Sequence, residues 1–240
     1  MSAALLESLR PWVEIESHTP DIEGVQRLVG HVAASGAAAG AHAERVPAEG
    51  YGDHLILRAP WNDGRKGVMV LSHLDTVHPR GTLAETPFRV EGDSAFGPGI
   101  YDMKGGAHGA HRGFCELIAE GRDDLPPLTH LFVSDEEVGS PTSRTLIERL
   151  AAEAAVVFVT EPAREGGKIV TARKGVARFV VEAKGRPAHS GSRHMDGRSA
   201  IREIARLVLA LEDMTDYESG LTVNVGTVEG GTGVNVVPAR

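Results

Sequence analysis

Val68-Met69-Val70-Leu71-Ser72-His73-Leu74-Asp75 is the stretch that decides the fold of this chain. Its first four residues form an apolar, valine-rich run, which is too short for a helix and predicts a buried strand. His73 and Asp75 follow two positions apart, a spacing that places both side chains on one side of an extended chain. An imidazole beside a carboxylate is typical of a metal site. Because the chain contains 11 His and 33 Asp plus Glu, a chance pair is also expected, and other segments must decide.

Two further apolar runs end in acidic residues. Leu128 to Ser134 precedes Asp135-Glu136-Glu137, and Ala155 to Thr160 precedes Glu161. Helical patterns lie between these runs, so the sequence predicts an α/β fold with a largely parallel sheet of buried strands. Ligands bind at the carboxyl ends of the strands in such sheets, so His73, Glu136, Glu137 and Glu161 are expected to meet at one edge.

The other elements are expected from periodicity and from chain-breaking residues. Helices are expected over residues 3–15, 21–34 (capped by Asp21), 107–119, 141–152 and 199–211. Further strands are expected over residues 43–46, 54–59, 168–171, 176–183, 221–229 and 234–237. A turn of the hairpin kind is expected at residues 61–64, and loops at 78–99 and 123–127. A second domain is expected to begin near residues 168–175, where the strand pattern becomes alternating.

Composition excludes several classes of function. The formal net charge of −8 argues against a nucleic-acid partner, which would need a basic surface. The single cysteine, Cys115, forms no internal disulfide, and its expected role is packing within a helix. No apolar run has the length of a membrane span, and residues 1–10 lack a signal-peptide core, so no membrane is expected and the cytoplasm is the expected location.

Asp102 is a further candidate ligand. It lies in G-P-G-I-Y-D-M-K-G-G, where glycines allow the backbone to turn around the acid, although a helix N-cap is the favoured explanation of Asp102 in isolation. Several carboxylates gathered around one histidine would repel one another unless cations bind there. This donor mixture suits Zn²⁺, with Mn²⁺ or Co²⁺ as substitutes. Two ions roughly 3.5–4 Å apart would form a hydrolase site, with either Glu136 or Glu137 left as the general base.

Four segments occur in a fixed order: H-L-D-T-V, G-P-G-I-Y-D-M-K-G-G, D-E-E-V-G-S and T-E-P. They resemble the dizinc metallopeptidase family of glutamate carboxypeptidase, aminoacylase, acetylornithine deacetylase and succinyl-diaminopimelate desuccinylase. The run A-R-K-G-V-A-R-F resembles the glutamate carboxypeptidase branch. The resemblance implies a phosphorylase/hydrolase-like catalytic domain with a mixed, largely parallel sheet over residues 1–170. It also implies an inserted α+β dimerisation (lid) domain, incomplete here, over residues 171–240.

The same resemblance implies roles for single residues. His73, Asp102 and Glu161 would hold one zinc, and Asp75 would orient His73. Asp102 would bridge to a second zinc, which Glu137 would bind. Glu136 would then be the general base and acid.

Two positions in the second domain also match the family. His189, in P-A-H-S-G, resembles a histidine that reaches the neighbouring subunit's substrate and oxyanion, although a plain loop histidine is the simpler reading without the match. Asn235 resembles a substrate-contacting asparagine. His108 and His111 lie at positions i and i+3 of one expected helix, where surface or packing roles are favoured over metal binding because no carboxylate motif accompanies them.

The implied reaction is hydrolysis of an amide bond next to a free carboxylate by metal-bound hydroxide, with a glutamate as base. The substrate would be a small peptide or an N-acyl amino acid, and the full-length enzyme a homodimer with two Zn²⁺. The family's final histidine ligand of the second zinc has no counterpart here, so the favoured interpretation is a piece of a longer protein. The alternative is an inactive fragment that binds metal or a partner without turnover. A phosphoesterase is a weaker rival, since no phosphate-binding loop is present.

Overall fold

The computed structural model describes residues 3–61, 63–121 and 124–240. Asn62, in the expected turn, and Asp123, in the expected loop, lie outside these ranges. The chain divides into two compact units, Met1–Ile169 and Val170–Arg240, each of which is described by itself.

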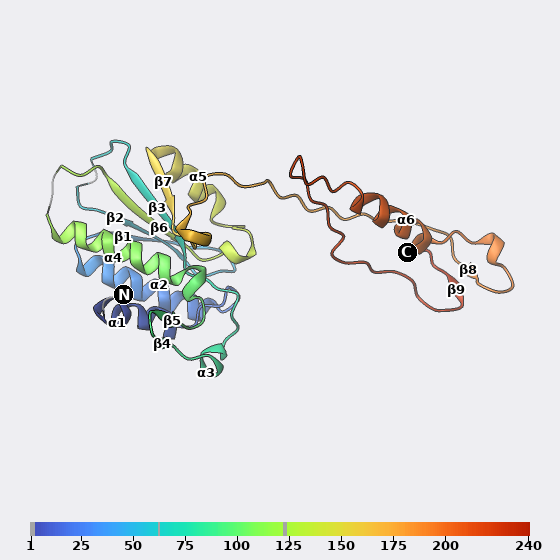
Figure 1. Ribbon diagram of the computed structural model, residues 1–240, viewed down its shortest axis with the longest axis horizontal. Helices are drawn as coiled ribbons and strands as arrows, with labels where there is room; N and C mark the ends of the chain where they lie inside the picture. Colours follow the sequence, from blue (N-terminus) through green and yellow to red (C-terminus); the bar gives the residue numbers. More distant parts are fainter. Residues whose placement is uncertain (1–2, 62, 122–123) are drawn as a thin grey trace. The chain divides into compact units, whose positions relative to one another are not determined.

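A five-stranded sheet forms the centre of the first unit (Figure 1). Its order is β1-β2-β6-β3-β7, formed by His42–Val46, His54–Arg58, Leu128–Val133, Val68–His73 and Val156–Val159. The pairings of β3 with β6 and β7 are parallel, whereas β2 pairs antiparallel with both β1 and β6. The sheet is therefore mixed, as expected, with β1, β6, β3 and β7 running in one direction and β2 in the opposite one. A short connection can join β1 to β2 because antiparallel neighbours need no crossover.

The sheet order corrects the interpretation of residues 61–64 as a hairpin turn. Strand β6 lies between β2 and β3, so the strands on either side of that segment are not paired with each other. A local turn pattern predicts a change of direction, but only long-range pairing decides which strands become neighbours.

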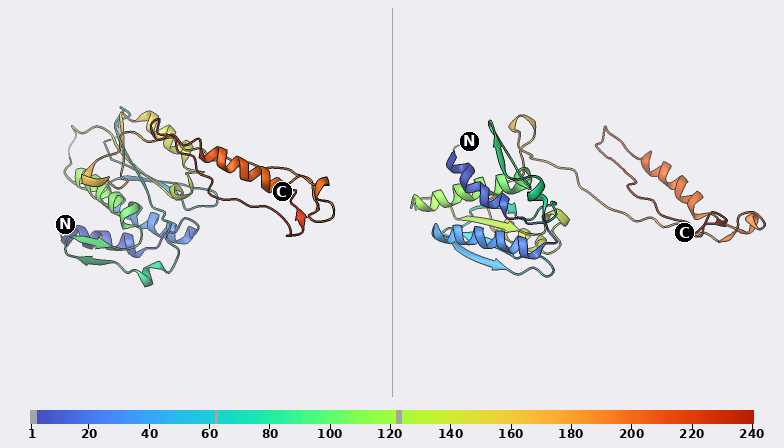
Figure 2. Two further views of the ribbon diagram at one scale, coloured as in Figure 1. Left: turned by 45° about the vertical axis from the view of Figure 1, so that its right-hand side comes forward. Right: turned by 90° about the horizontal axis from the view of Figure 1, so that it is seen from below.

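Helices cover both faces of the sheet. α1 (Ala3–Glu14), α2 (Ile22–Ala38) and α4 (Gly105–Ala119) pack on one face around a buried apolar cluster. α5 (Arg144–Glu153) packs on the other face around a second cluster. The alternation within β2 explains this division, because Leu55 and Leu57 join the first cluster while Ile56 joins the second. Figure 2 gives two further views of these layers.

Residues 78–99 are more regular than the expected loop. They contain the one-turn helix α3 (Thr82–Glu85) and a hairpin of β4 (Arg89–Glu91) and β5 (Ser94–Phe96). Gly92, in the hairpin turn, has a positive φ of 57°, a conformation that glycine adopts without steric cost. A high content of glycine and proline thus indicates turns here rather than the absence of structure.

Strand β7 is exposed rather than buried, contrary to expectation. It is the edge strand of the sheet, and the side chains of Phe158 and Val159 are more than half exposed. Its apolar sequence indicates a strand, but apolar content alone does not reveal that only one neighbour pairs with it.

The second unit contains one long helix, α6 (Ala200–Glu212), and a two-residue ladder of β8 (Ala188–His189) and β9 (Val236–Val237). It also contains a short helical turn at His194–Asp196 (η4). The corresponding short turns of the first unit are Ile100–Lys104 (η1), Glu136–Val138 (η2) and Glu165–Gly167 (η3). The strands expected over residues 168–171, 176–183 and 221–229 are not formed. A strand needs a neighbour to bond its backbone N–H and C=O groups, and an alternating pattern does not supply one.

No helix in the described part of the chain is long and apolar enough to cross a bilayer.

Candidate metal centre

His73 ends β3 and is almost completely buried. Its Nδ1–H donates to the main-chain oxygen of Asp75 at 2.9 Å. This bond makes Nδ1 the donor, so Nε2 carries the lone pair on the other side of the ring whenever the ring is neutral, as it is in a metal ligand. The carboxylate of Asp75 is expected to orient the ring of His73. In this structure the main-chain oxygen of Asp75 accepts the hydrogen bond from Nδ1, and its nearer carboxylate oxygen lies 3.5 Å from Nδ1.

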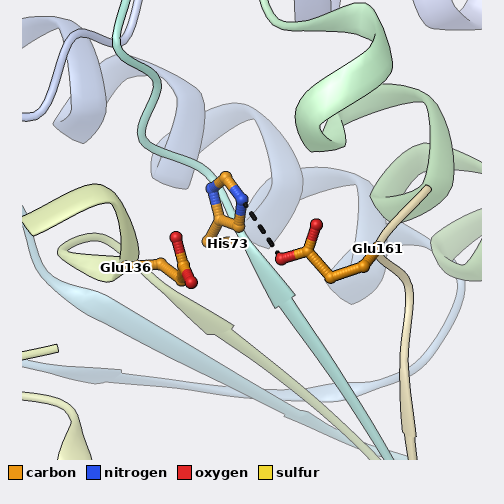
Figure 3. A group of neighbouring side chains, drawn as sticks. All are labelled: His73, Glu136 and Glu161. Atoms are coloured by element: carbon orange, nitrogen blue, oxygen red, sulfur yellow. Dashed lines mark ion pairs between the residues drawn. The ribbon is translucent and has the colours of Figure 1, made fainter. Parts of the chain in front are cut away.

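Carboxylates surround Nε2. Asp102 Oδ1 lies 3.0 Å from this nitrogen and Glu161 Oε1 lies 3.8 Å from it. Figure 3 shows the imidazole of His73 between the carboxylates of Glu136 and Glu161. These residues come from the ends of β3, β6 and β7 and from the turn before α4, so the strand ends meet at one edge of the sheet.

Two sets of side chains can hold a metal ion in the described part of the chain. One set is His73, Glu136 and Glu161, and the other is His73, Asp102 and Glu137, with ligand atoms within 4.8 Å of one another in each set. One imidazole and several carboxylates form a donor set that suits Zn²⁺. These two sets contain five of the six residues that the sequence motifs single out in this unit, all except Asp75, and the division of roles among them stays a prediction.

Electrostatics favour a cation at this point. Burial lowers the pKa of His73, but the neighbouring carboxylates of Asp75 and Glu136 outweigh burial and raise that pKa to about 9. Burial also raises the pKa of Glu137; the charge of His73 opposes this shift, while Asp102 and the other nearby carboxylates add to it. Both shifts show that negative charge accumulates here, and positive charge stabilises such a cluster.

Asp102 does not act as an N-cap in this structure. The cap position of α4 is Lys104, and no side chain caps it by a hydrogen bond. Asp102 instead has non-helical backbone angles within η1, and its carboxylate oxygen Oδ1 lies 3.0 Å from His73 Nε2. The interpretation of Asp102 as the N-cap of a helix is therefore wrong.

Three residues at the site were not identified from the sequence. Thr19 donates its hydroxyl proton to Asp75 Oδ2 at 2.8 Å, and Lys104 Nζ donates to the main-chain oxygen of Ile15 at 2.8 Å. Asp135 accepts bonds from the backbone N–H groups of Thr142 and Ser143, so it anchors the loop before α5 and not a metal. In the sequence Thr19 appears only within a helix break, and nothing local reveals its distant partner.

His108 and His111 have a packing role. Both are buried in α4, their rings contact the Trp12 ring, and neither belongs to the metal-binding sets found among the described residues. The preference for packing over metal binding is thus in agreement with the structure. Cys115, one turn further along α4, is half-buried, and its Sγ lies 3.6 Å from His111 Nε2.

His189 and Asn235 are neighbours within the second unit. His189 pairs with Val236 in the β8–β9 ladder, and the N–H of Ser190 donates to the main-chain oxygen of Asn235. His189 Nδ1 accepts bonds from the N–H groups of Gly191 and Ser192. Because Nδ1 is an acceptor, the ring proton lies on Nε2, which is left as a donor.

Known proteins resemble both parts of the chain. Residues 171–240 match the peptidase dimerisation domain M20_dimer. The whole chain is 34% identical over 239 residues to carboxypeptidase G2 from Pseudomonas sp. (strain RS-16), covering 98% of this chain and 57% of that protein. It is also 34% identical over 177 residues to a peptidase M20 domain-containing protein from Schizosaccharomyces pombe, an alignment that covers 72% of this chain and 42% of that protein. The chain thus spans about half the length of these relatives.

Solved structures share the fold at low sequence identity. The aminopeptidase PepT from Bacillus cereus aligns with a TM-score of 0.71 at 19% identity, over 98% of this chain and 63% of that one. The M20 family metallo-carboxypeptidase Sso-CP2 from Sulfolobus solfataricus aligns with a TM-score of 0.64 at 18% identity, over 89% and 51%. These likenesses support the α/β fold with a mixed sheet.

Proposed function

Because the chain belongs to the M20 peptidase family, on the glutamate carboxypeptidase branch, we propose that it forms part of a zinc-dependent hydrolase. The bond cleaved is an amide next to a free carboxylate, as in a dipeptide, a C-terminal amino acid or an N-acyl amino acid. The observation that carries this proposal is the convergence of His73 with four carboxylates at the carboxyl edge of the sheet.

We assign the ligands as His73, Asp102 and Glu161 for one ion and Asp102 and Glu137 for the other. The buried imidazole supports this assignment, since its Nδ1–H is committed to a carbonyl and its Nε2 faces the carboxylates. Bound divalent ions would supply an activated water near neutral pH and polarise the substrate carbonyl.

Glu136 is the proposed general base. It follows β6 beside Glu137, and its carboxylate lies near His73 and Glu161. In this role it takes the proton from the attacking water and returns it to the leaving amine. A base must lie within hydrogen-bond reach of the water, and the position of Glu136 beside the proposed ligands His73 and Glu161 supports this role.

His189 and Asn235 are proposed to bind substrate in a homodimer. The tautomer of His189 supports this, because its free Nε2–H can donate to an oxyanion of a neighbouring subunit's site. We assign residues 1–170 to the catalytic domain and 171–240 to the dimerisation domain. We place the enzyme in the cytoplasm, since its single cysteine forms no internal disulfide.

The decisive experiment replaces the proposed base. Glu136→Ala should lower kcat by roughly 10²–10⁴-fold, the usual contribution of a general base, while zinc content stays near that of the wild type. The assay follows release of free amino acid from an N-acyl amino acid and from a dipeptide, with zinc measured by mass spectrometry. Glu120→Ala, at an exposed position after α4, is the control and should retain full activity.

The same measurements separate the enzyme from a non-catalytic metal-binding fragment. Near two zinc ions per chain with turnover supports the enzyme. One ion or none without turnover supports the fragment, and unchanged kcat in Glu136→Ala rules out Glu136 as the base.

A further inference from the structure

The carboxylate of Asp75 is bonded to the turn that carries the two glutamates. Asp75 Oδ1 accepts a bond from the backbone N–H of Glu136 at 3.3 Å, and Oδ2 accepts one from that of Glu137 at 3.2 Å. Asp75 is completely buried, so these donors replace the water that would otherwise bind its carboxylate. Asp75 thus connects His73, through its main-chain oxygen, to the backbone of η2, through its carboxylate.

Thr19 makes the shortest bond to this carboxylate. Its hydroxyl donates to Asp75 Oδ2 at 2.8 Å, from a residue that is itself 2% exposed. A hydroxyl has one proton to donate, and Thr19 uses it here. Removing the hydroxyl would leave a buried carboxylate with two longer bonds from backbone N–H groups, which hold it less firmly than the three bonds together.

The segment around Thr19 is held in place by other bonds. The Ser17 hydroxyl donates to the main-chain oxygen of Leu74 at 2.7 Å. The N–H of Thr76 donates to the main-chain oxygen of Ser17 at 2.9 Å. The N–H of Thr19 donates to the main-chain oxygen of Thr76 at 3.1 Å. Because these bonds do not involve the Thr19 hydroxyl, the segment should stay docked when that hydroxyl is removed.

We propose that Thr19 is a positioning residue for the metal centre, which acts by holding the Asp75 carboxylate against the backbone of Glu136 and Glu137. The effect on metal binding follows from these contacts, and the effect on turnover rests on the proposed function. Residues that orient metal ligands from outside the ligand shell typically contribute about 10–100-fold in metal affinity or activity.

The test compares three variants of the whole protein. Thr19→Val removes the hydroxyl at nearly constant shape, and Thr19→Ser restores it. Ser17→Ala is the matched control, because it removes a buried hydroxyl from the same segment without touching the Asp75 carboxylate. Urea unfolding of each variant measures the stability that each hydroxyl contributes.

Two measurements report on the centre without relying on turnover. Co²⁺ titration, followed by visible absorption, should show affinity about 10–100-fold lower in Thr19→Val and near wild type in Thr19→Ser and Ser17→Ala. In the metal-free protein, hydrogen exchange at the N–H groups of Glu136 and Glu137 should be faster in Thr19→Val only. In the active enzyme kcat should fall with KM little changed.

Unchanged Co²⁺ affinity and unchanged exchange in Thr19→Val would overturn the inference. Equal losses in Thr19→Val and Ser17→Ala would also overturn it, since the segment would then act only as a structural support. A protein that binds Co²⁺ with the expected order of affinities but cleaves no amide would disprove the proposed function and leave the role of Thr19 intact.

Discussion

At the scale of single residues, the position of the proposed ligand Glu161 depends on how closely α4 approaches the backbone before it, as well as on charge. Gly106, at the start of α4, lies so near β7 that a Cβ built on it would be 2.0 Å from the main-chain oxygen of Thr160. Thr160 directly precedes the proposed ligand Glu161. For Gly109, on the same helix, no atom of the described residues lies within 4 Å of such a Cβ, apart from its own helix backbone and its chain neighbours. These two glycines therefore have different physical roles.

The pair Gly106→Ala and Gly109→Ala should have opposite effects. Gly109→Ala should raise the free energy of unfolding by about 0.5–1 kcal/mol, because alanine loses less backbone entropy in a helix. Gly106→Ala should lower it by about 1–3 kcal/mol, as expected for overpacking, and should weaken Zn²⁺ binding because the segment holding Glu161 must shift. Urea unfolding and zinc titration measure both effects. Equal stabilisation by the two substitutions would contradict the close approach seen at Gly106.

At the scale of elements, α4 buries histidines against the sheet. Burial lowers the pKa of His108 and of His111 to about 4, with Arg112 adding to the shift of His108 and His31 to both. His130, on β6, is fully buried, and its pKa lies well below its ordinary value for the same reason. These groups stay neutral in the folded protein under mildly acidic conditions.

Acid should therefore weaken the packing of α4. Between pH 6.5 and about 4 the unfolded chain binds protons that folded His108 and His111 do not, so the free energy of unfolding falls as the pH falls through this window. The expected loss from pH 7 to pH 5 is about 2 kcal/mol for each of the two histidines. Urea unfolding at the two pH values measures it.

A pair of variants identifies the source of this pH dependence. His111→Gln should reduce the loss between pH 7 and pH 5, whereas His42→Gln, at an exposed position on β1, should leave it unchanged. An undiminished loss in His111→Gln would mean that other groups cause the acid sensitivity.

At the scale of the whole molecule, the two units differ in how much apolar surface they bury. Both apolar clusters lie in the first unit. Among the apolar residues of the second unit, only Ala200 and Val237 are buried, while Val176, Phe179 and Val180 are almost fully exposed. The segment 169–185 contains neither helix nor strand.

Limited proteolysis should therefore cut first within the segment 169–185. Trypsin is expected to cleave at Arg173, Lys174 or Arg178 before it cleaves at Arg206, which is exposed but lies within α6. Proteases bind extended chain, and a helix must unfold locally before it is cut. Mass spectrometry of a time course should detect a product ending near residue 174. First cleavage within the sheet-bearing unit would contradict this order.

The sequence by itself predicted the four longer helices and the five sheet strands of the first unit, and the candidate ligands. The periods of 3.6 and 2 residues predict helices and strands locally, so α1, α2, α4, α5 and the five strands lie close to their expected ranges. Three of the motifs follow strands and contain His73, Glu137 and Glu161, so their convergence is predicted because strand ends share an edge. These inferences succeed because the signals lie within a few residues of each other.

Only the tertiary structure decided the pairings and partners that join distant residues. It placed β6 between β2 and β3, left β7 exposed at the edge and formed no strand over residues 176–183. It also brought Thr19 to Asp75 across 56 positions and buried His108 and His111 against Trp12. The physical reason is that hydrogen bonds and burial depend on which surfaces meet, and local periodicity carries no information on a partner far along the chain.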